Sequence, residues 1–178
     1  MRIIAGKYKK SNLFSVPGKT SRPTTDYIKE LLFSVIQDCQ DQQILDLYSG
    51  SGGISFEALS RGAKFSTMVD FSDKAISTMK KNIEKLACSE QCRIHKKRAT
   101  AFLKKTEQSF DLIFMDPPYE KNLVNKTISQ IVENKRLKSG GKIAIEHSFR
   151  EKIAAKYSDN TIFYKKNGDT AITILQFC

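Results

Sequence analysis

The sequence of 178 residues has no long apolar run, no signal peptide pattern and few histidines. No stretch reaches the roughly 18 consecutive apolar residues of a membrane span. The first residues, 1–7, lack the longer apolar stretch of a signal peptide. We therefore expect a cytoplasmic protein. Only two histidines are present, His95 and His147, and we interpret both as structural.

The four cysteines do not form the patterns that mark disulfide frameworks or zinc sites. None belongs to a Cys-x-x-Cys pair and their spacing is uneven, which is typical of reduced thiols in a cytosolic chain. Cys88, Cys92 and His95 would supply only three ligands of a structural zinc site. Because a strand is also predicted at 92–95, we predict no metal site there.

Acidic residues are few relative to basic ones. The chain has 30 lysines and arginines against 19 aspartates and glutamates, a net charge of +11. This excess favours a polyanionic partner, with nucleic acid as the first candidate. A lysine-rich composition can also follow from genome base composition, so the charge alone leaves the partner open.

From residue 42 onward, short apolar runs alternate with amphipathic stretches, a pattern typical of a parallel sheet covered by helices. The turn Asn167-Gly168-Asp169 separates two further apolar runs and predicts an antiparallel hairpin. The predicted fold is therefore α/β and Rossmann-like, a mostly parallel seven-stranded sheet with an antiparallel carboxy-terminal hairpin. Strands are predicted at 43–47, 65–70, 92–95, 110–115, 141–146, 161–165 and 171–177, and helices near 53–61, 73–86, 99–105 and 123–134.

The first 40 residues differ in character from the rest. They open with a basic stretch, turn at the Pro-Gly pair 17–18 and lead into an amphipathic helix that ends near Gln37. A chain of this length has room for one domain of ordinary size. We predict a short amino-terminal extension over 1–40 and one α/β domain over 41–178.

A glycine-rich loop, Asp46-Leu-Tyr-Ser-Gly50-Ser-Gly52-Gly53, follows the first predicted strand. Glycines at this position let the backbone approach a ligand and direct the free N–H groups of the next helix at it. Asp70 ends the second strand, where a carboxylate can accept the ribose hydroxyls of NAD or of S-adenosylmethionine. A solvated strand-end carboxylate is the plainer alternative. The candidate cofactor-binding residues are Asp46, Tyr48, Gly50, Ser51, Gly52, Asp70 and Phe71.

The segment Asp116-Pro117-Pro118-Tyr119 follows the apolar run 110–115 and favours S-adenosylmethionine, because a nicotinamide enzyme has no use for it. An aromatic exocyclic amine is a poor nucleophile, since its lone pair is delocalised into the ring. Hydrogen bonds to the Asp116 carboxylate and to a carbonyl such as that of Pro117 would let the nitrogen pyramidalise. The prolines remove competing backbone donors. Tyr119 offers a face on which an extruded base can stack. These four residues are the predicted catalytic set.

Together with other segments, these motifs resemble the RsmD family over nearly the whole chain. The resemblance implies a class I methyltransferase that transfers a methyl group from S-adenosylmethionine to the N2 amino group of one guanine in bacterial 16S ribosomal RNA. The implied partner is this RNA within the small ribosomal subunit or an assembly intermediate. Nothing in the sequence demands a partner protomer, so we expect a monomer. The further matching segments are Arg2-Ile-Ile-Ala-Gly-Lys-Tyr8, Arg22-Pro-Thr-Thr-Asp26 and Glu57-Ala-Leu-Ser-Arg-Gly62.

The resemblance also implies that Arg22, Thr24 and Thr25 border the cofactor and the target base. Arg22 could clamp a phosphate, and the threonine hydroxyls could bond backbone or base. A helix cap at Thr24 or Thr25 is an equally good interpretation and does not exclude the first. Lys9 and Lys10 complete the predicted substrate-binding set.

One position departs from the family pattern. Where the family usually has Asp-Ala after the third strand, to meet the adenine amino group, this chain has Arg98-Ala99. Arginine cannot accept a hydrogen bond. A backbone carbonyl could substitute, cofactor affinity could be lower, or Arg98 could face RNA phosphate. A solvated charged turn over 96–98 is the plainer alternative.

Two other functions fit the same motifs. An adenine-N6 methyltransferase acting on RNA or DNA uses the same chemistry. The DNA version is disfavoured, because 40 amino-terminal residues leave no room for a separate recognition domain. A catalytically silent RNA-binding assembly factor is the second alternative.

Overall fold

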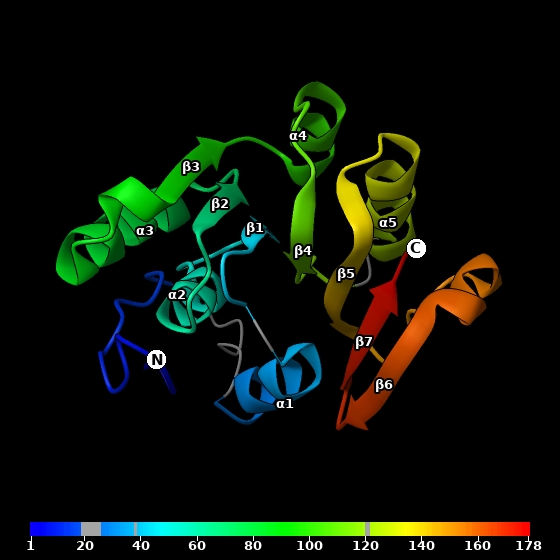
Figure 1. The fold of residues 1–178 in the computed structure, drawn as a ribbon, viewed down its shortest axis with the longest axis horizontal. Coiled ribbons are helices and arrows are strands. Elements are labelled where there is room, and N and C mark those ends of the chain that lie inside the picture. The colour runs from blue at the N-terminus through cyan, green and yellow to red at the C-terminus, as the bar shows by residue number, and fades with distance from the viewer. Residues whose placement is uncertain (19–25, 38, 120–121) are drawn as a thin grey trace.

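A seven-stranded sheet in the order β3-β2-β1-β4-β5-β7-β6 forms the centre of the protein (Figure 1). The computed structural model describes residues 1–18, 26–37, 39–119 and 122–178. Neighbouring strands from β3 to β5 pair in parallel, whereas β7 pairs antiparallel with both β5 and β6. The strands are β1 (Gln43–Leu47), β2 (Phe65–Asp70), β3 (Cys92–Lys96), β4 (Phe110–Met115), β5 (Leu137–Ser148), β6 (Thr161–Asn167) and β7 (Thr170–Gln176).

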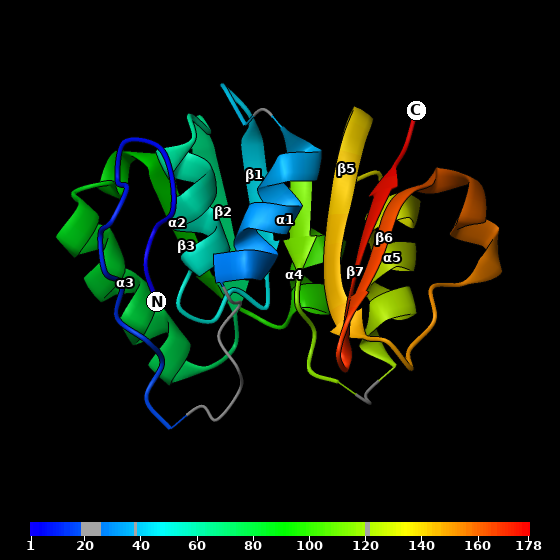
Figure 2. The same ribbon diagram turned by 90° about the horizontal axis from the view of Figure 1, so that it is seen from below.

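Helices cover both faces of the sheet (Figure 2). One apolar cluster joins the strands to α1 (Asp26–Ile36), α2 (Gly53–Ser60) and α3 (Asp73–Leu86). A second cluster, on the other face, joins them to α4 (Ala99–Lys105) and α5 (Leu123–Glu133). Two short 3-10 helices are η1 (Ser89–Gln91) and η2 (Ala155–Asn160). In the described residues, no helix is long and apolar enough to cross a membrane.

The mostly parallel sheet and the carboxy-terminal hairpin predicted from the sequence are confirmed. The main difference is the start of β5, which begins at Leu137 rather than at residue 141. The pairing register with β4 shifts between Phe110 and Leu112, whose partners are Leu137 and Lys142. Gly140 has a φ of 73° in this irregular stretch. An exposed, glycine-containing bulge therefore interrupts the apolar pattern that marks the rest of the strand.

The strand order brings the two predicted motifs together. β1 lies between β2 and β4, and Leu47 of β1 is paired with Met115 of β4. The glycine loop and the segment that begins at Asp116 therefore leave the same edge of the sheet from adjacent strands. In an open α/β sheet, this edge beside the point where the strand order reverses is where ligands bind.

The amino-terminal extension packs into the same core as the sheet. Ile3 and Leu13 are buried in one cluster with residues of α1 and of the strands. Phe33 of α1 lies against Phe114 of β4, with 5.7 Å between ring centroids. The boundary between residues 40 and 41 stays a prediction, and the two segments share one apolar interior.

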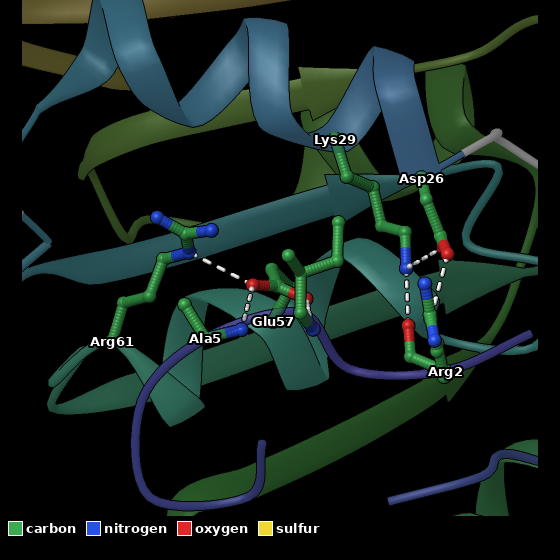
Figure 3. A network of polar contacts seen from close by, with 7 residues as sticks. Arg2, Ala5, Asp26, Lys29, Glu57 and Arg61 are labelled. Carbon is green, nitrogen blue, oxygen red and sulfur yellow. Dashed lines mark hydrogen bonds and ion pairs between the residues drawn. The ribbon is translucent and has the colours of Figure 1, made fainter. Parts of the chain in front are cut away.

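Buried polar side chains also fasten the extension (Figure 3). The fully buried carboxylate of Glu57, in α2, accepts hydrogen bonds from the backbone nitrogens of Ile4 (2.8 Å) and Ala5 (3.1 Å). Its Oε1 also accepts from Arg61 Nε at 2.8 Å. A charged acceptor on three donors is a strong and specific clamp.

A second clamp lies at the start of the extension. Lys29 is 1% exposed, and its ammonium group donates to the carbonyl of Arg2 and pairs with Asp26 Oδ1 at 3.2 Å. Arg2 Nε in turn bonds Asp26 Oδ2 at 2.9 Å. The network holds the first residues against α1 as well as α2.

We predict that Glu57→Ala lowers the free energy of unfolding by about 3 kcal/mol, because three donors lose a buried charged acceptor. Urea denaturation measures the change. Glu84→Ala removes an exposed glutamate from α3 and should change the stability by less than about 0.5 kcal/mol. Equal effects of the two substitutions would contradict the role of Glu57 as a clamp.

Candidate functional site

The glycine loop after β1 has an unusual backbone. Tyr48, Gly50 and Gly52 all have positive φ angles, of 62°, 56° and 81°. The side chain of Ser49 fixes this path, because its Oγ donates to the carbonyl of Asp46 (2.6 Å) and accepts from the nitrogen of Val69 (2.8 Å). The side chain of Ser49 therefore ties the loop to β2.

Position 52 requires glycine for two reasons, its positive φ angle and the lack of room for a side chain. A Cβ atom at this position would lie 2.6 Å from the ring of Phe56 and 2.9 Å from the sulfur of Met68. Gly52 is also the residue from which α2 begins, and no side chain caps that helix. The first residue of α2, Gly53, lies against the side chain of Met1, where a Cβ atom would be 2.6 Å from the methionine sulfur.

Asp70, the last residue of β2, is the second element of the site. Its Oδ2 accepts from the nitrogen of Gly50 and its Oδ1 from the nitrogen of Ser72, both at 2.9 Å. A carboxylate oxygen has two lone pairs, so each oxygen can accept one more hydrogen bond. Asp70 is 8% exposed. It shapes the loop and can also receive two hydroxyl groups of a ligand.

Asp46 is nearly buried beside the same loop. Ser55 Oγ in α2 donates to its Oδ2 at 2.7 Å. The pKa of Asp46 is raised to about 7. Burial is the largest cause, the negative charges of Asp70 and Asp116 act in the same direction, and the Ser55 hydrogen bonds oppose the rise. Carboxylates from the ends of β1, β2 and β4 therefore share one electrostatic environment.

The segment after β4 carries the predicted catalytic residues. Asp116 is exposed, Pro117 is buried, and Pro118 and Tyr119 are exposed. The Tyr119 hydroxyl forms a hydrogen bond of 2.9 Å with Thr170 Oγ1, at the start of β7. The aromatic ring is thus anchored at its tip while 40% of the residue stays accessible.

Two aromatic residues of the predicted cofactor set behave differently. The Tyr48 hydroxyl bonds Thr127 of α5 at 2.9 Å, and burial raises the pKa of Tyr48. Its side chain therefore anchors the loop on α5. Phe71 is 57% exposed, and the guanidinium carbon of Arg98 lies 5.4 Å from the centroid of its ring. Arg98 is thus a cation–π partner of a candidate cofactor-binding residue.

Of the predicted substrate-binding residues, the structure describes only Lys9 and Lys10, and these two lie away from this edge of the sheet. Arg22, Thr24 and Thr25 lie outside the described residues. Lys9 and Lys10 are exposed on a turn that is fastened to Ser60, the last residue of α2. An eight-residue helix is roughly 12 Å long, so the turn lies about that far from the glycine loop. A role of these residues in RNA binding stays a prediction.

Sequence reasoning missed three polar residues that hold the site together. Ser55 bonds Asp46 and Thr170 bonds Tyr119, as described above. Asn82 is fully buried and donates to the carbonyls of Ser51 (3.0 Å) and Phe14 (3.1 Å). A polar residue within the apolar stripe of a predicted helix is the signal that could have revealed Asn82.

A nucleoside cofactor with a positively charged amino-acid tail fits the described residues. The left-handed loop admits close approach of a ligand, Asp70 can accept two hydroxyls, and Asp46 and Asp116 offer negative charge. The exposed ring of Phe71 offers an aromatic face next to Asp70.

We predict that Asp46→Asn removes a pH dependence of stability. The folded state binds the Asp46 proton more tightly than the unfolded chain does, because the pKa of Asp46 is about 7 when folded and near 3.8 when unfolded. The contribution to stability is therefore complete below pH 4 and lost as the pH rises through about 7. Relative to the variant, the wild type should lose up to about 4 kcal/mol between pH 4 and pH 8. Urea denaturation of both proteins across this range measures the difference, and parallel curves would contradict the shift.

Comparisons with known proteins identify relatives along the whole chain. The family described as conserved hypothetical protein 95 matches residues 1–176. Ribosomal RNA small subunit methyltransferase D of Buchnera aphidicola is 40% identical over 150 residues, which are 82% of this chain and 75% of that protein. The solved structure of yhhF from Escherichia coli has a TM-score of 0.88 at 30% identity and covers 99% of this chain and 97% of its own.

A more distant structure shares the fold. The methyltransferase SMU.776, solved with SAH bound, has a TM-score of 0.67 at 14% identity. The match covers 83% of this chain and 48% of that one.

Proposed function

The chain belongs to the RsmD family of S-adenosylmethionine-dependent methyltransferases, and from this premise we propose that it methylates the N2 amino group of a guanine in 16S ribosomal RNA. The substrate would be this RNA within the small subunit or an assembly intermediate, and the enzyme would act as a cytoplasmic monomer. One observation carries the proposal most directly. Asp116-Pro-Pro-Tyr119 leaves β4 beside the glycine loop of β1, in a chain whose relatives are named for the methylation of ribosomal RNA.

Each cofactor-binding residue would contact a different part of S-adenosylmethionine. Asp70 would accept the ribose hydroxyls, Phe71 would face the adenine, and the backbone of Gly50 to Gly52 would border the amino-acid tail. Asp46 would lie near the ammonium group of that tail, and a cation there would lower its raised pKa. S-adenosylmethionine supplies an electrophilic methyl group on a positively charged sulfur.

Asp116 and the carbonyl of Pro117 would prepare the nucleophile. Each would accept one N–H of the target amino group, so that the nitrogen lone pair leaves the plane of the base and points at the methyl carbon. Because Asp116 is exposed at the strand end, a base can approach it from solvent. Catalysis then rests on orientation for in-line displacement.

Tyr119 would hold the base in that orientation. A guanine within a stack cannot reach Asp116, so it must be extruded or already unpaired. The hydrogen bond of the Tyr119 hydroxyl to Thr170 fixes the ring before the base arrives. A preformed stacking surface lowers the entropy that is lost on binding.

The proposal is tested by incubating the purified protein and S-adenosylmethionine with undermethylated small subunits, naked 16S RNA and duplex DNA. Nucleoside mass spectrometry then identifies the product. We expect N2-methylguanosine with the ribosomal substrates alone. N6-methyladenine would show the other amino-methyltransferase activity, and the absence of transfer to every substrate would favour a silent assembly factor.

We predict that Asp116→Ala lowers the methyl-transfer rate at least about a thousandfold, because an acceptor that orients the amine in the transition state is lost. Cofactor binding, measured by calorimetry, should change less than about threefold. Asp159→Ala removes an exposed carboxylate before β6, at the opposite edge of the sheet, and should leave the rate unchanged. A normal rate in Asp116→Ala would refute the assigned role.

A further inference from the structure

A group of cationic and aromatic side chains lies next to the catalytic segment, outside every motif described above. Two cations lie over the ring of Phe149, which follows β5. Lys166 Nζ is 3.9 Å from the ring centroid and the guanidinium carbon of Arg150 is 5.4 Å from it. We call Phe149, Arg150 and Lys166 the rim cluster.

Strand register places the rim cluster beside Tyr119. Thr170, which bonds the Tyr119 hydroxyl, is paired with Ser148 of β5 and with Asn167 of β6. Phe149 and Lys166 are each one residue from these partners. Figure 2 shows the end of β5 and the β6–β7 turn at the edge of the sheet from which the β1 and β4 loops emerge.

The loop that carries Arg150 is held by several hydrogen bonds. The nitrogen of Phe149 donates to the carbonyl of Asp169, and Glu151 Oε1 accepts from the nitrogen of Val124 at the start of α5. Asn125 of α5 bonds the carbonyl of Lys152 and the nitrogen of Ala154, both at 2.8 Å. These hydrogen bonds fix the loop against α5 and the β6–β7 turn.

Neither cation has an acidic partner among the described residues. Arg150 and Lys166 are both exposed, and neither forms an ion pair with a carboxylate in the part of the chain that the structure describes. Of the nearby acids, Glu151 is engaged at α5, and Asp169 is exposed on the turn. Two like charges gathered on one ring repel each other, and an anion bound between them relieves the repulsion.

An exposed aromatic ring lies on the same strand as Lys166. Tyr164 is 56% exposed and lies two residues before Lys166 on β6, so both side chains point to the same face of the strand. Cations that alternate with exposed rings suit single-stranded nucleic acid, whose phosphates and bases they contact together.

We propose that the rim cluster binds the backbone of the single-stranded RNA segment that flanks the target nucleotide, with Arg150 and Lys166 on its phosphates. This inference rests on the proposed function and adds a specific substrate-binding surface to it. A base stacked on Tyr119 leaves its neighbouring nucleotides at this edge. The rim cluster offers two exposed cations there, next to the strand partners of Thr170.

The test compares Arg150→Gln/Lys166→Gln with Lys104→Gln/Lys105→Gln. The control pair also removes two exposed positive charges, those of Lys104 and Lys105. These lysines lie in the last turn of α4, at the opposite edge of the sheet. Binding to naked 16S RNA is measured between 50 and 300 mM KCl. We expect the rim variant to flatten the slope of log K against log salt by about 1.4, the value for two single-strand phosphate contacts. The control should keep the wild-type slope.

Methyl transfer to undermethylated small subunits gives a second readout. The KM of the rim variant should rise about tenfold, with a smaller change in kcat, and Arg150→Lys/Lys166→Arg should restore it because both charges are kept. Urea denaturation checks that the variants remain folded.

A wild-type slope in the rim variant would overturn the proposal, as would an equal loss of slope in the control pair. A raised KM on subunits with an unchanged slope on naked RNA would also overturn it and would point to a ribosomal protein. Failure of the wild type to methylate any RNA would refute the proposed function instead, and the binding slopes would still decide the role of the rim cluster.

Discussion

The parallel pairing of β1 with β4 is the contact on which the site depends. These strands are separated by more than 60 residues in the sequence, and their pairing places Leu47 opposite Met115. The glycine loop and Asp116 then emerge side by side. Each motif alone would be a strand followed by a turn, and only their adjacency forms a place where a cofactor and an amine can meet.

The same pairing brings negative charges together. Asp46, Asp70 and Asp116 lie at or just after the ends of three neighbouring strands. Burial, together with the negative charges of the other two, raises the pKa of Asp46. A site of this kind favours a positively charged ligand, because a cation lowers the electrostatic cost of ionising all three. S-adenosylmethionine, with its sulfonium and ammonium groups, satisfies this condition, whereas the nicotinamide cofactors carry a strongly negative pyrophosphate.

The amino-terminal extension is part of the same construction. Glu57 clamps its first turn, and Asn82 links Phe14 to Ser51 of the glycine loop. A buried side chain that contacts both segments makes the position of one depend on the other. The extension and the glycine loop therefore share a buried contact.

The sequence by itself determined the strands and helices and the family, and it predicted the chemistry of the main motifs. Apolar runs marked the strands, since burial on a parallel sheet leaves a local pattern. The chemistry predicted for Asp116 to Tyr119 was readable because it rests on four consecutive residues. The start of β5 at Leu137 was missed because a bulge with exposed residues interrupts that pattern.

Only the tertiary structure decided which side chains meet. The bonds of Ser55 to Asp46 and Thr170 to Tyr119, the cation–π contact of Arg98 with Phe71 and the rim cluster all depend on chain crossovers and strand register. Residues far apart in sequence leave no periodic signal of their contact, because periodicity reports only which face of an element is buried. Strand order and register set the distances between those faces, and they are fixed when the whole core packs.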